Sequence, residues 1–188
     1  AVSSLDILVK NDYDVVAVVT APDKPAGRGQ KLKQTAVKVY AEKKGLKILQ
    51  PEKLKSEEFI KQLKVLNASL QIVVAFRMLP KIVWNMPEIG TFNLHGSLLP
   101  QYRGAAPINW AVINGETETG VTTFFLKHQI DTGQVIFQEK IAIGENDNAG
   151  EIHDELMMVG AGLVLKTVKA IEADSYPKIE QSELLKEK

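Results

Sequence analysis

Val15-Val16-Ala17-Val18-Val19-Thr20 is a nearly continuous apolar run in which most side chains are branched at the β-carbon. Such a run is typical of a strand that is buried on both faces, as the strands of parallel sheets are. Leu70–Phe76 shows the same pattern further along the chain. The two runs therefore predict a sheet that is covered by helices on both sides.

Helical patterns alternate with the apolar runs along the rest of the chain. This alternation predicts a layered α/β sandwich with a mostly parallel sheet. Asn148 opens the longest helix with the spacing of a capping box. Helices are expected at Thr35–Lys44, Glu57–Leu66, Pro80–Asn85, Pro107–Asn114 and Asn148–Glu172, and further strands at Lys47–Leu49, Thr91–Leu94, Val121–Leu126 and Gln134–Ile143, the last two antiparallel across Asp131-Thr132-Gly133.

Length and composition limit the function. A chain of 188 residues favours one domain, and 23 basic against 23 acidic residues give no net charge. Any contact with RNA must therefore come from a local basic patch. The absence of cysteine excludes disulfides and a thiol nucleophile, and it fits the cytoplasm. No apolar run approaches the length of a membrane span, and no His/Asp/Glu spacing indicates a metal site.

The polar stretch Asn93-Leu94-His95-Gly96-Ser97-Leu98-Leu99-Pro100 follows a predicted strand. Asn93 and His95 are two residues apart, so they point to the same face of that strand. Ligands of parallel sheets bind beyond the carboxyl ends of the strands, which is where these side chains would lie. The loop Ser97–Pro100 could present backbone groups to a ligand. Alternatively, His95 only makes a buried hydrogen bond at a strand end.

Four further residues have candidate roles, and the first two allow two interpretations each. Asp131, before Thr132 and Gly133, suits a turn, but a carboxylate near His95 would also orient the ring and favour its charged form. Arg103 could hold an anion or pair with a carboxylate. His128 could line a pocket near Asp131, whereas His153 lies on the long predicted helix and suits a surface or packing role.

Pro22–Lys33 is a long polar segment after a buried strand, and it carries Lys24, Arg28, Lys31 and Lys33. Loops of this length in compact domains tend to be functional, and this basic charge suits a phosphate backbone. The alternative is a solvated surface loop. The segment lacks the pattern of a nucleotide-binding Walker loop.

The chain resembles the folate-dependent formyltransferases through three stretches: Asn93–Pro100, Tyr102-Arg103-Gly104-Ala105-Ala106-Pro107 and Asp131-Thr132-Gly133. Two more, Pro22–Gly29 and Gln50–Leu54, resemble the branch that acts on methionyl-tRNA. The resemblance covers nearly the whole chain. It implies a Rossmann-like three-layer sandwich and transfer of a formyl group from 10-formyltetrahydrofolate to the α-amine of initiator methionyl-tRNA. It also implies a cytoplasmic monomer that uses no metal.

The resemblance also assigns roles to residues. Asn93, His95 and Asp131 match the catalytic residues, with Asn93 and His95 holding the oxyanion intermediate. The folate would be bound by Ser97, Leu98, Leu99 and Pro100, with a pterin pocket of Phe76, Arg77, Met78, Leu79, His128, Gln129 and Ile130. Lys24, Arg28, Lys31 and Lys33 would contact tRNA, and Tyr102, Arg103 and Gly104 would form a substrate loop.

Some features depart from the family pattern. The family has a strand and a Gly-Thr-Pro turn before a segment like Ala1–Leu5, so a mid-sheet strand is expected to precede this chain. Residues 1–175 are expected to form the catalytic domain, and residues 176–188 the start of a linker to a further, barrel-like domain. Arg77 and Gln129 stand where glycine is common and are expected to reshape the pterin pocket.

Other functions remain open on the sequence. A formyltransferase with a small-molecule amine as acceptor would use the same chemistry, and a hydrolase would release formate from the same donor. A non-catalytic module that binds folate or RNA is a third alternative. The basic segment Pro22–Lys33 favours an RNA acceptor, because a small acceptor needs no such arm.

Overall fold

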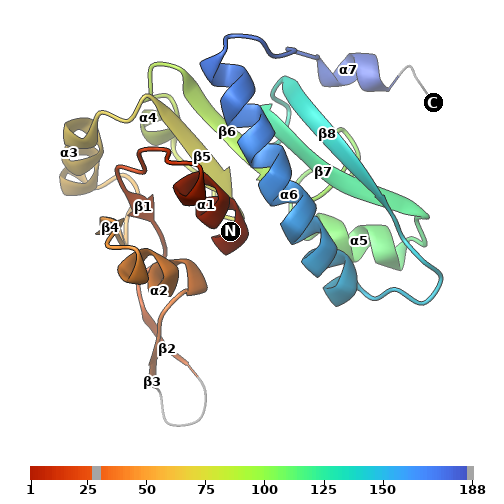
Figure 1. The fold of residues 1–188 in the computed structure, drawn as a ribbon, viewed down its shortest axis with the longest axis horizontal. Helices are drawn as coiled ribbons and strands as arrows, with labels where there is room; N and C mark the ends of the chain where they lie inside the picture. The colour runs from red at the N-terminus through yellow and green to blue at the C-terminus, as the bar shows by residue number, and fades with distance from the viewer. Residues whose placement is uncertain (27–30, 186–188) are drawn as a thin grey trace.

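The computed structural model describes residues 1–26 and 31–185. It shows the expected α/β sandwich, with the main sheet between two groups of helices (Figure 1). In the main sheet, strands β5 to β8 lie in sequence order; β5 and β6 are parallel, whereas β6, β7 and β8 are antiparallel neighbours. A separate parallel pair contains β1 and β4. The strands are β1 (Val18–Val19), β4 (Ile48–Leu49), β5 (Leu70–Val74), β6 (Gly90–His95), β7 (Glu118–Phe125) and β8 (Val135–Ala142).

Helices cover both faces of the strands. On one face, Leu8 of α1 and Val164 of α6 pack in a buried cluster with Phe92 of β6. On the other, Phe59 of α3 and Val83 of α4 form a second cluster. Together these clusters place the sheet in the middle layer. The helices are α1 (Val2–Lys10), α2 (Ala36–Lys43), α3 (Glu57–Leu66), α4 (Lys81–Trp84), α5 (Pro107–Ile113), α6 (Ala149–Glu172) and α7 (Gln181–Leu184).

Side-chain caps fix the starts of three helices. Thr35 accepts from the backbone N–H of Lys38 at the start of α2, and Ser56 caps α3. At α6, Asn148 and Glu151 bond reciprocally to each other's backbone, as the sequence predicted. These bonds satisfy N–H groups that have no partner inside a helix.

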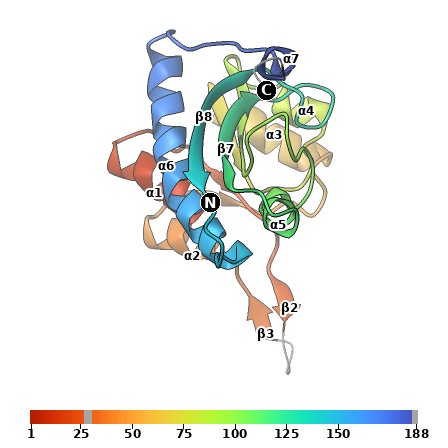
Figure 2. The ribbon, with the colours of Figure 1, turned by 90° about the vertical axis from the view of Figure 1, so that its right-hand side faces the viewer.

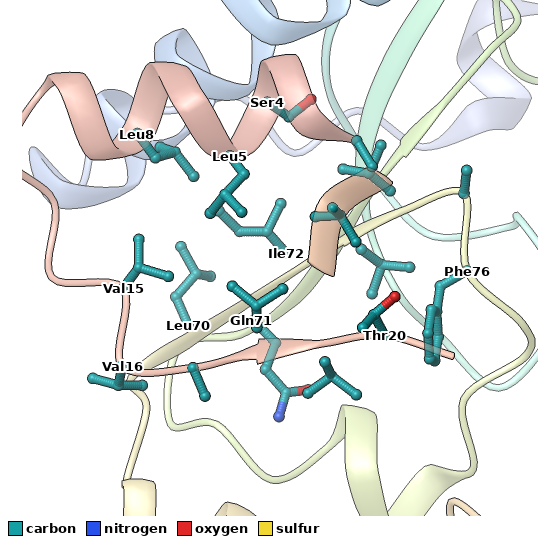
Figure 3. A pocket seen from close by; sticks show the side chains of 18 of the residues that line it. Ser4, Leu5, Leu8, Val15, Val16, Thr20, Leu70, Gln71, Ile72 and Phe76 are labelled. Carbon is teal, nitrogen blue, oxygen red and sulfur yellow. The ribbon is translucent and has the colours of Figure 1, made fainter. Parts of the chain in front are cut away.

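The two apolar runs behave differently from the expectation. Only Val18–Val19 of the first run pairs as a strand, and Leu70–Val74 is half-buried rather than fully buried. The reason is that β1 pairs with β4 and β5 pairs with β6, while a cavity of about 990 Å³ lies between β1 and β5. Figure 3 shows Leu5 and Leu8 of α1 above this cavity, with Ile72 beside it.

Three elements were not predicted. Helix α1 begins the chain, and the polar segment contains an antiparallel hairpin of β2 (Lys24–Ala26) and β3 (Lys31–Lys33). The third is α7, within the segment expected to begin a linker. Ile179 exchanges two backbone hydrogen bonds with Val135, of 2.8 and 3.0 Å, so this segment packs against the start of β8.

Candidate active site

Asn93 and His95 lie on the same face of β6, at its carboxyl end, as predicted. Their backbone partners across the sheet are Phe124 and Thr122 of β7. The Oδ1 atom of Asn93 is buried and has no hydrogen-bond partner among the described residues. Buried polar atoms are nearly always paired, so an unpaired amide oxygen indicates a group that meets a ligand.

His95 is only 6% exposed and has oxygen atoms on both sides of its ring. The Nε2 atom lies 2.8 Å from the backbone oxygen of Tyr102, which is hydrogen-bonding distance. The Nδ1 atom lies 3.8 Å from Oδ2 of Asp131, which is an ion-pair distance rather than a direct hydrogen bond. The ring therefore lies between a carbonyl oxygen within hydrogen-bonding distance of Nε2 and a carboxylate that faces Nδ1.

Asp131 reaches His95 from the connection between β7 and β8. Its backbone is left-handed, with φ of 51°, which is uncommon for a residue other than glycine. Its Oδ2 atom also accepts a hydrogen bond of 2.8 Å from the backbone N–H of Gly104. Asp131 therefore lies in a turn and also faces His95, whereas its effect on the charge of the ring stays a prediction.

The loop Ser97–Pro100 is supported from inside the protein. Ser97 is fully buried and Leu99 is 1% exposed. The Thr122 hydroxyl donates to the backbone oxygen of Ser97 at 2.7 Å and accepts from the N–H of Leu99 at 3.1 Å. Gln138 donates to the backbone oxygen of Leu99 at 2.9 Å. The buried side chains of Ser97 and Leu99 thus hold the loop, and Leu98 and Pro100 are its half-buried members.

The predicted pterin residues form two segments. Phe76, Arg77, Met78 and Leu79 follow β5, whose last residue, Val74, pairs with Leu94 beside the carboxyl end of β6. The guanidinium of Arg77 donates to the backbone oxygens of Pro51 and Glu52. This side chain is therefore bound to the segment that follows β4. The second segment, His128, Gln129 and Ile130, is exposed and leads into Asp131. Met78 and Ile130 are 74% and 57% exposed, so both side chains are open to solvent.

The predicted substrate loop borders His95 and is tied to its surroundings. Besides the backbone oxygen that meets His95, Tyr102 has a phenol that donates to Glu116 at 2.5 Å. That hydrogen bond raises the pKa of the Tyr102 phenol above its usual value, so the phenol stays neutral. Arg103 donates from Nε and Nη2 to the side-chain oxygen of Gln181, at 3.0 and 2.6 Å. Its observed partner is thus an amide rather than a carboxylate.

The basic hairpin projects away from the body of the protein in two perpendicular views (Figures 1 and 2). Lys24 pairs directly with Lys33 across its strands, and both side chains are exposed; Lys31 lies on β3, opposite Ala26. Arg28 falls outside the described residues.

Contacts at the base of the hairpin hold it to the domain. Asp23 accepts hydrogen bonds from Lys38 at 2.6 Å and from Gln50 at 2.8 Å. Gln50 also donates to the backbone oxygen of Ala21 at 2.9 Å. The hairpin therefore starts from a fixed position on the body of the protein.

Sequence reasoning missed the polar residues that support the site. Thr122 and Gln138 lie on β7 and β8, and Thr122 is fully buried. A threonine in the middle of an apolar strand was a visible signal, because a buried hydroxyl needs a partner. Gln181 carried no such signal. In the described part of the chain, no three His, Asp or Glu side chains come together as a metal site, and no helix has the length and apolar character to span a membrane.

Comparisons with known proteins identify relatives of this chain. The methionyl-tRNA formyltransferase of Flavobacterium johnsoniae is 64% identical over 172 residues, which cover 92% of this chain and 55% of the relative. The enzyme of the same name from Bacteroides fragilis is 62% identical over 184 residues, covering 98% and 57%. The chain thus spans a little more than half the length of these curated relatives.

Two solved structures show the same fold at low sequence identity. A phosphoribosylglycinamide formyltransferase from Streptococcus pneumoniae has a TM-score of 0.75 at 20% identity, covering 90% of this chain and 92% of that one. A formyltetrahydrofolate deformylase from Pseudomonas syringae has a TM-score of 0.73 at 18% identity, covering 92% and 59%. Residues 3–168 match the family model described as formyl transferase. The chain belongs to the formyl transferase family.

Proposed function

We propose that this chain carries the formyl-transferring site of an enzyme that moves a formyl group from 10-formyltetrahydrofolate to the α-amine of initiator methionyl-tRNA. The observation that carries the proposal is the group of Asn93, His95 and Asp131, in which the buried Oδ1 of Asn93 lacks a partner among the described residues. The relatives named methionyl-tRNA formyltransferase support the choice of acceptor.

The site suits attack of an amine on a formyl carbon. The amine nitrogen forms the new bond while the carbonyl oxygen takes up negative charge. The amide N–H of Asn93 and the N–H at Nδ1 of His95, which has no direct hydrogen bond to Asp131, stabilise that oxyanion. The Oδ1 of Asn93 accepts a hydrogen bond from the attacking amine. Preorganised donors of this kind contribute large rate effects in acyl transfer.

Asp131 takes part in the proton transfers of the reaction. The amine must lose one proton after the attack, and N10 of the folate must gain one as its bond to the formyl carbon breaks. The carboxylate of Asp131, 3.8 Å from Nδ1 of His95, takes the proton that the amine loses, and a proton is returned to N10 as its bond to the formyl carbon breaks. No covalent intermediate on the protein is needed.

The two substrates occupy different sides of this group. We assign the donor to the loop Ser97–Pro100 and the pterin to the exposed segments Phe76–Leu79 and His128–Ile130. We assign the tRNA to the hairpin, where Lys24 and Lys33 lie opposite each other. Like charges across a strand pair cost stability, by roughly 0.2–1 kcal/mol, and a bound phosphate offsets that cost. We further propose that the enzyme is a monomer and works in the cytoplasm.

Formyl transfer to competing acceptors tests the proposal. The test uses a longer protein that contains this chain and has the length of its relatives. This protein is mixed with 10-formyltetrahydrofolate and methionyl-tRNA, with 10-formyltetrahydrofolate and glycinamide ribonucleotide, or with 10-formyltetrahydrofolate alone. We expect formylated methionyl-tRNA only. Formylation of the ribonucleotide alone would show that the acceptor is a small molecule rather than tRNA. Formate release without an acceptor would indicate a hydrolase. Folate binding with no turnover would indicate a non-catalytic binding module.

A further inference from the structure

Gln181 joins two loops of the active site through one buried side chain. It is the first residue of α7 and is only 3% exposed. Its amide Nε2 donates to the backbone oxygens of Asp131 and Gly133, at 2.8 and 2.9 Å. Its Oε1 accepts both hydrogen bonds from Arg103. The side-chain amide of Gln181 thus hydrogen-bonds through its NH₂ group to the loop that carries Asp131 and through its oxygen to the loop that carries Arg103.

The loop that Gln181 holds is one that needs support. The left-handed backbone of Asp131 is unfavourable for a residue with a side chain, so its surroundings must maintain it. The bond to the Asp131 oxygen is made at this strained residue, and the bond to Gly133 is made two residues later. Gln181 therefore fixes the direction in which the Asp131 carboxylate points.

A second connection closes the network. The backbone N–H of Gly104 donates to Oδ2 of Asp131 at 2.8 Å, and Gly104 directly follows Arg103. The same loop supplies the Tyr102 oxygen that meets His95. Gln181 binds this loop through Arg103 and the opposite loop through backbone oxygens, so both oxygen partners of His95 depend on it.

The segment around Gln181 is itself fixed. Ile179 is paired with Val135 on β8 through two backbone bonds. Glu180 accepts from Gln134 at 2.7 Å and from Lys127 at 3.3 Å. The position of Gln181 is therefore set by the pairing of Ile179 with the start of β8 and by contacts of Glu180 with both ends of the β7–β8 connection.

We propose that Gln181 is a positioning residue for formyl transfer, which holds the Asp131 carboxylate against His95, with Arg103 as its partner. It does not touch the reacting atoms. The kinetic part of the inference rests on the proposed function, whereas the placement of Asp131 can be measured without any substrate.

Two substitutions distinguish the hydrogen bonds that the Gln181 side chain donates from those that it accepts. Both are made in a longer protein that contains this chain and has the length of its relatives. Gln181→Met keeps the length of the side chain and removes every hydrogen bond. Gln181→Glu keeps an oxygen for Arg103 and removes the two bonds donated to Asp131 and Gly133. Arg103→Met cuts the network at an exposed residue, where folding is not at risk. Gln62→Glu makes the same amide-to-acid change on α3 and serves as the control.

We expect kcat to fall roughly 10- to 100-fold in both Gln181 variants, since a small misplacement of a catalytic group has effects of this size. Arg103→Met should also lower kcat, and Gln62→Glu should leave kcat unchanged. The ring-proton resonances of His95 in the NMR spectrum should move toward their positions in an Asp131→Asn variant. A role in stability alone would lower Tm without moving these resonances.

The outcomes distinguish the two proposals. A wild-type protein that transfers no formyl group would overturn the proposed function, and the His95 resonances would still test the placement of Asp131. Wild-type kcat and resonances in Gln181→Met and Gln181→Glu would overturn the role of Gln181 while leaving the function intact. If either Gln181 variant fails to fold, unchanged His95 resonances in Arg103→Met would overturn it as well.

Discussion

His95 and Asp131 come from different parts of the sheet, yet Nδ1 of His95 lies 3.8 Å from Oδ2 of Asp131. The strand β6 supplies the histidine, and the connection between β7 and β8 supplies the carboxylate. Because β7 lies beside β6 in antiparallel register, the connection after β7 can return over the face that carries Asn93 and His95. Phe125, the last residue of β7, pairs with Phe92, so the connection turns back along β6 to bring Asp131 to His95.

Asp131→Asn should lower kcat by roughly 100- to 10 000-fold, the range attributed to positioned acid–base groups. The amide keeps the size of the carboxylate and an acceptor for the Gly104 N–H, so the loop should persist. Only the negative charge and the proton-accepting oxygen are lost. Steady-state kinetics with methionyl-tRNA, alongside Tm, measure the change, and a variant with wild-type kcat would remove Asp131 from the mechanism.

Asn93→Ala should lower kcat by about 100- to 1000-fold, as loss of one oxyanion donor does elsewhere. The Oδ1 of Asn93 makes no hydrogen bond to the described residues, so removing the amide leaves no other protein group unpaired through that atom. The folate donor should bind with nearly unchanged Kd. Titration calorimetry with the donor and kinetics with tRNA separate the two effects; a large loss of folate affinity at wild-type kcat would contradict the assignment.

Much of the fold was predictable because hydrophobic periodicity is a local property. The helix Glu57–Leu66 has the predicted bounds, and the predicted pair Val121–Leu126 and Gln134–Ile143 is antiparallel. The first apolar run was less predictable, since pairing depends on its neighbours. Val15–Thr20 has the composition of a central strand, but only Val18–Val19 pairs, next to a cavity.

The candidate site was predictable only where the residues carry chemistry themselves. Asn93 and His95 follow from their spacing on one strand, and the structure places Asp131 beside them. Gln181 could not be found in this way, because its role depends on a tertiary contact of the chain after α6 with a loop far away in sequence. An isolated glutamine near the end of a chain has no local pattern.

Lys24→Ala and Lys33→Ala should weaken tRNA binding and raise the KM for tRNA. The slope of log affinity against log salt concentration should fall by about 0.7 to 0.9 for each lysine that contacts a phosphate. The Kd of the folate donor should not change, because the hairpin projects away from the body of the protein (Figure 2). Lys61→Ala on α3, also an exposed lysine, is the matched control. Equal salt slopes in wild type and both variants would argue against this surface.

Asp23→Asn should destabilise the protein at neutral pH more than at acidic pH. The hydrogen bond from Lys38 lowers the pKa of the Asp23 carboxyl below its ordinary value of 3.8, with a further contribution from Gln50. A carboxyl whose pKa is lower in the folded state stabilises that state above pH 3.8, and this stabilisation is lost as the pH falls through the lower, folded value. The difference in Tm between wild type and Asp23→Asn should therefore shrink below pH 3.8. A constant difference from pH 7 to pH 2 would contradict the linkage.

Gly133→Ala should disrupt the loop that carries Asp131, whereas Gly162→Ala should be tolerated. A β-carbon at residue 133 would lie 1.6 Å from the backbone oxygen of Phe125, which no rotation of a side chain can relieve. The same atom at residue 162 meets nothing within 4 Å, and alanine favours a helix over glycine by about 1 kcal/mol. We expect Gly133→Ala to cost about 3 kcal/mol or more and to lower Tm by about 10 °C. Gly162→Ala should hold or raise Tm, and thermal unfolding of the pair measures both; equal Tm values would show that the backbone near Phe125 yields at little cost.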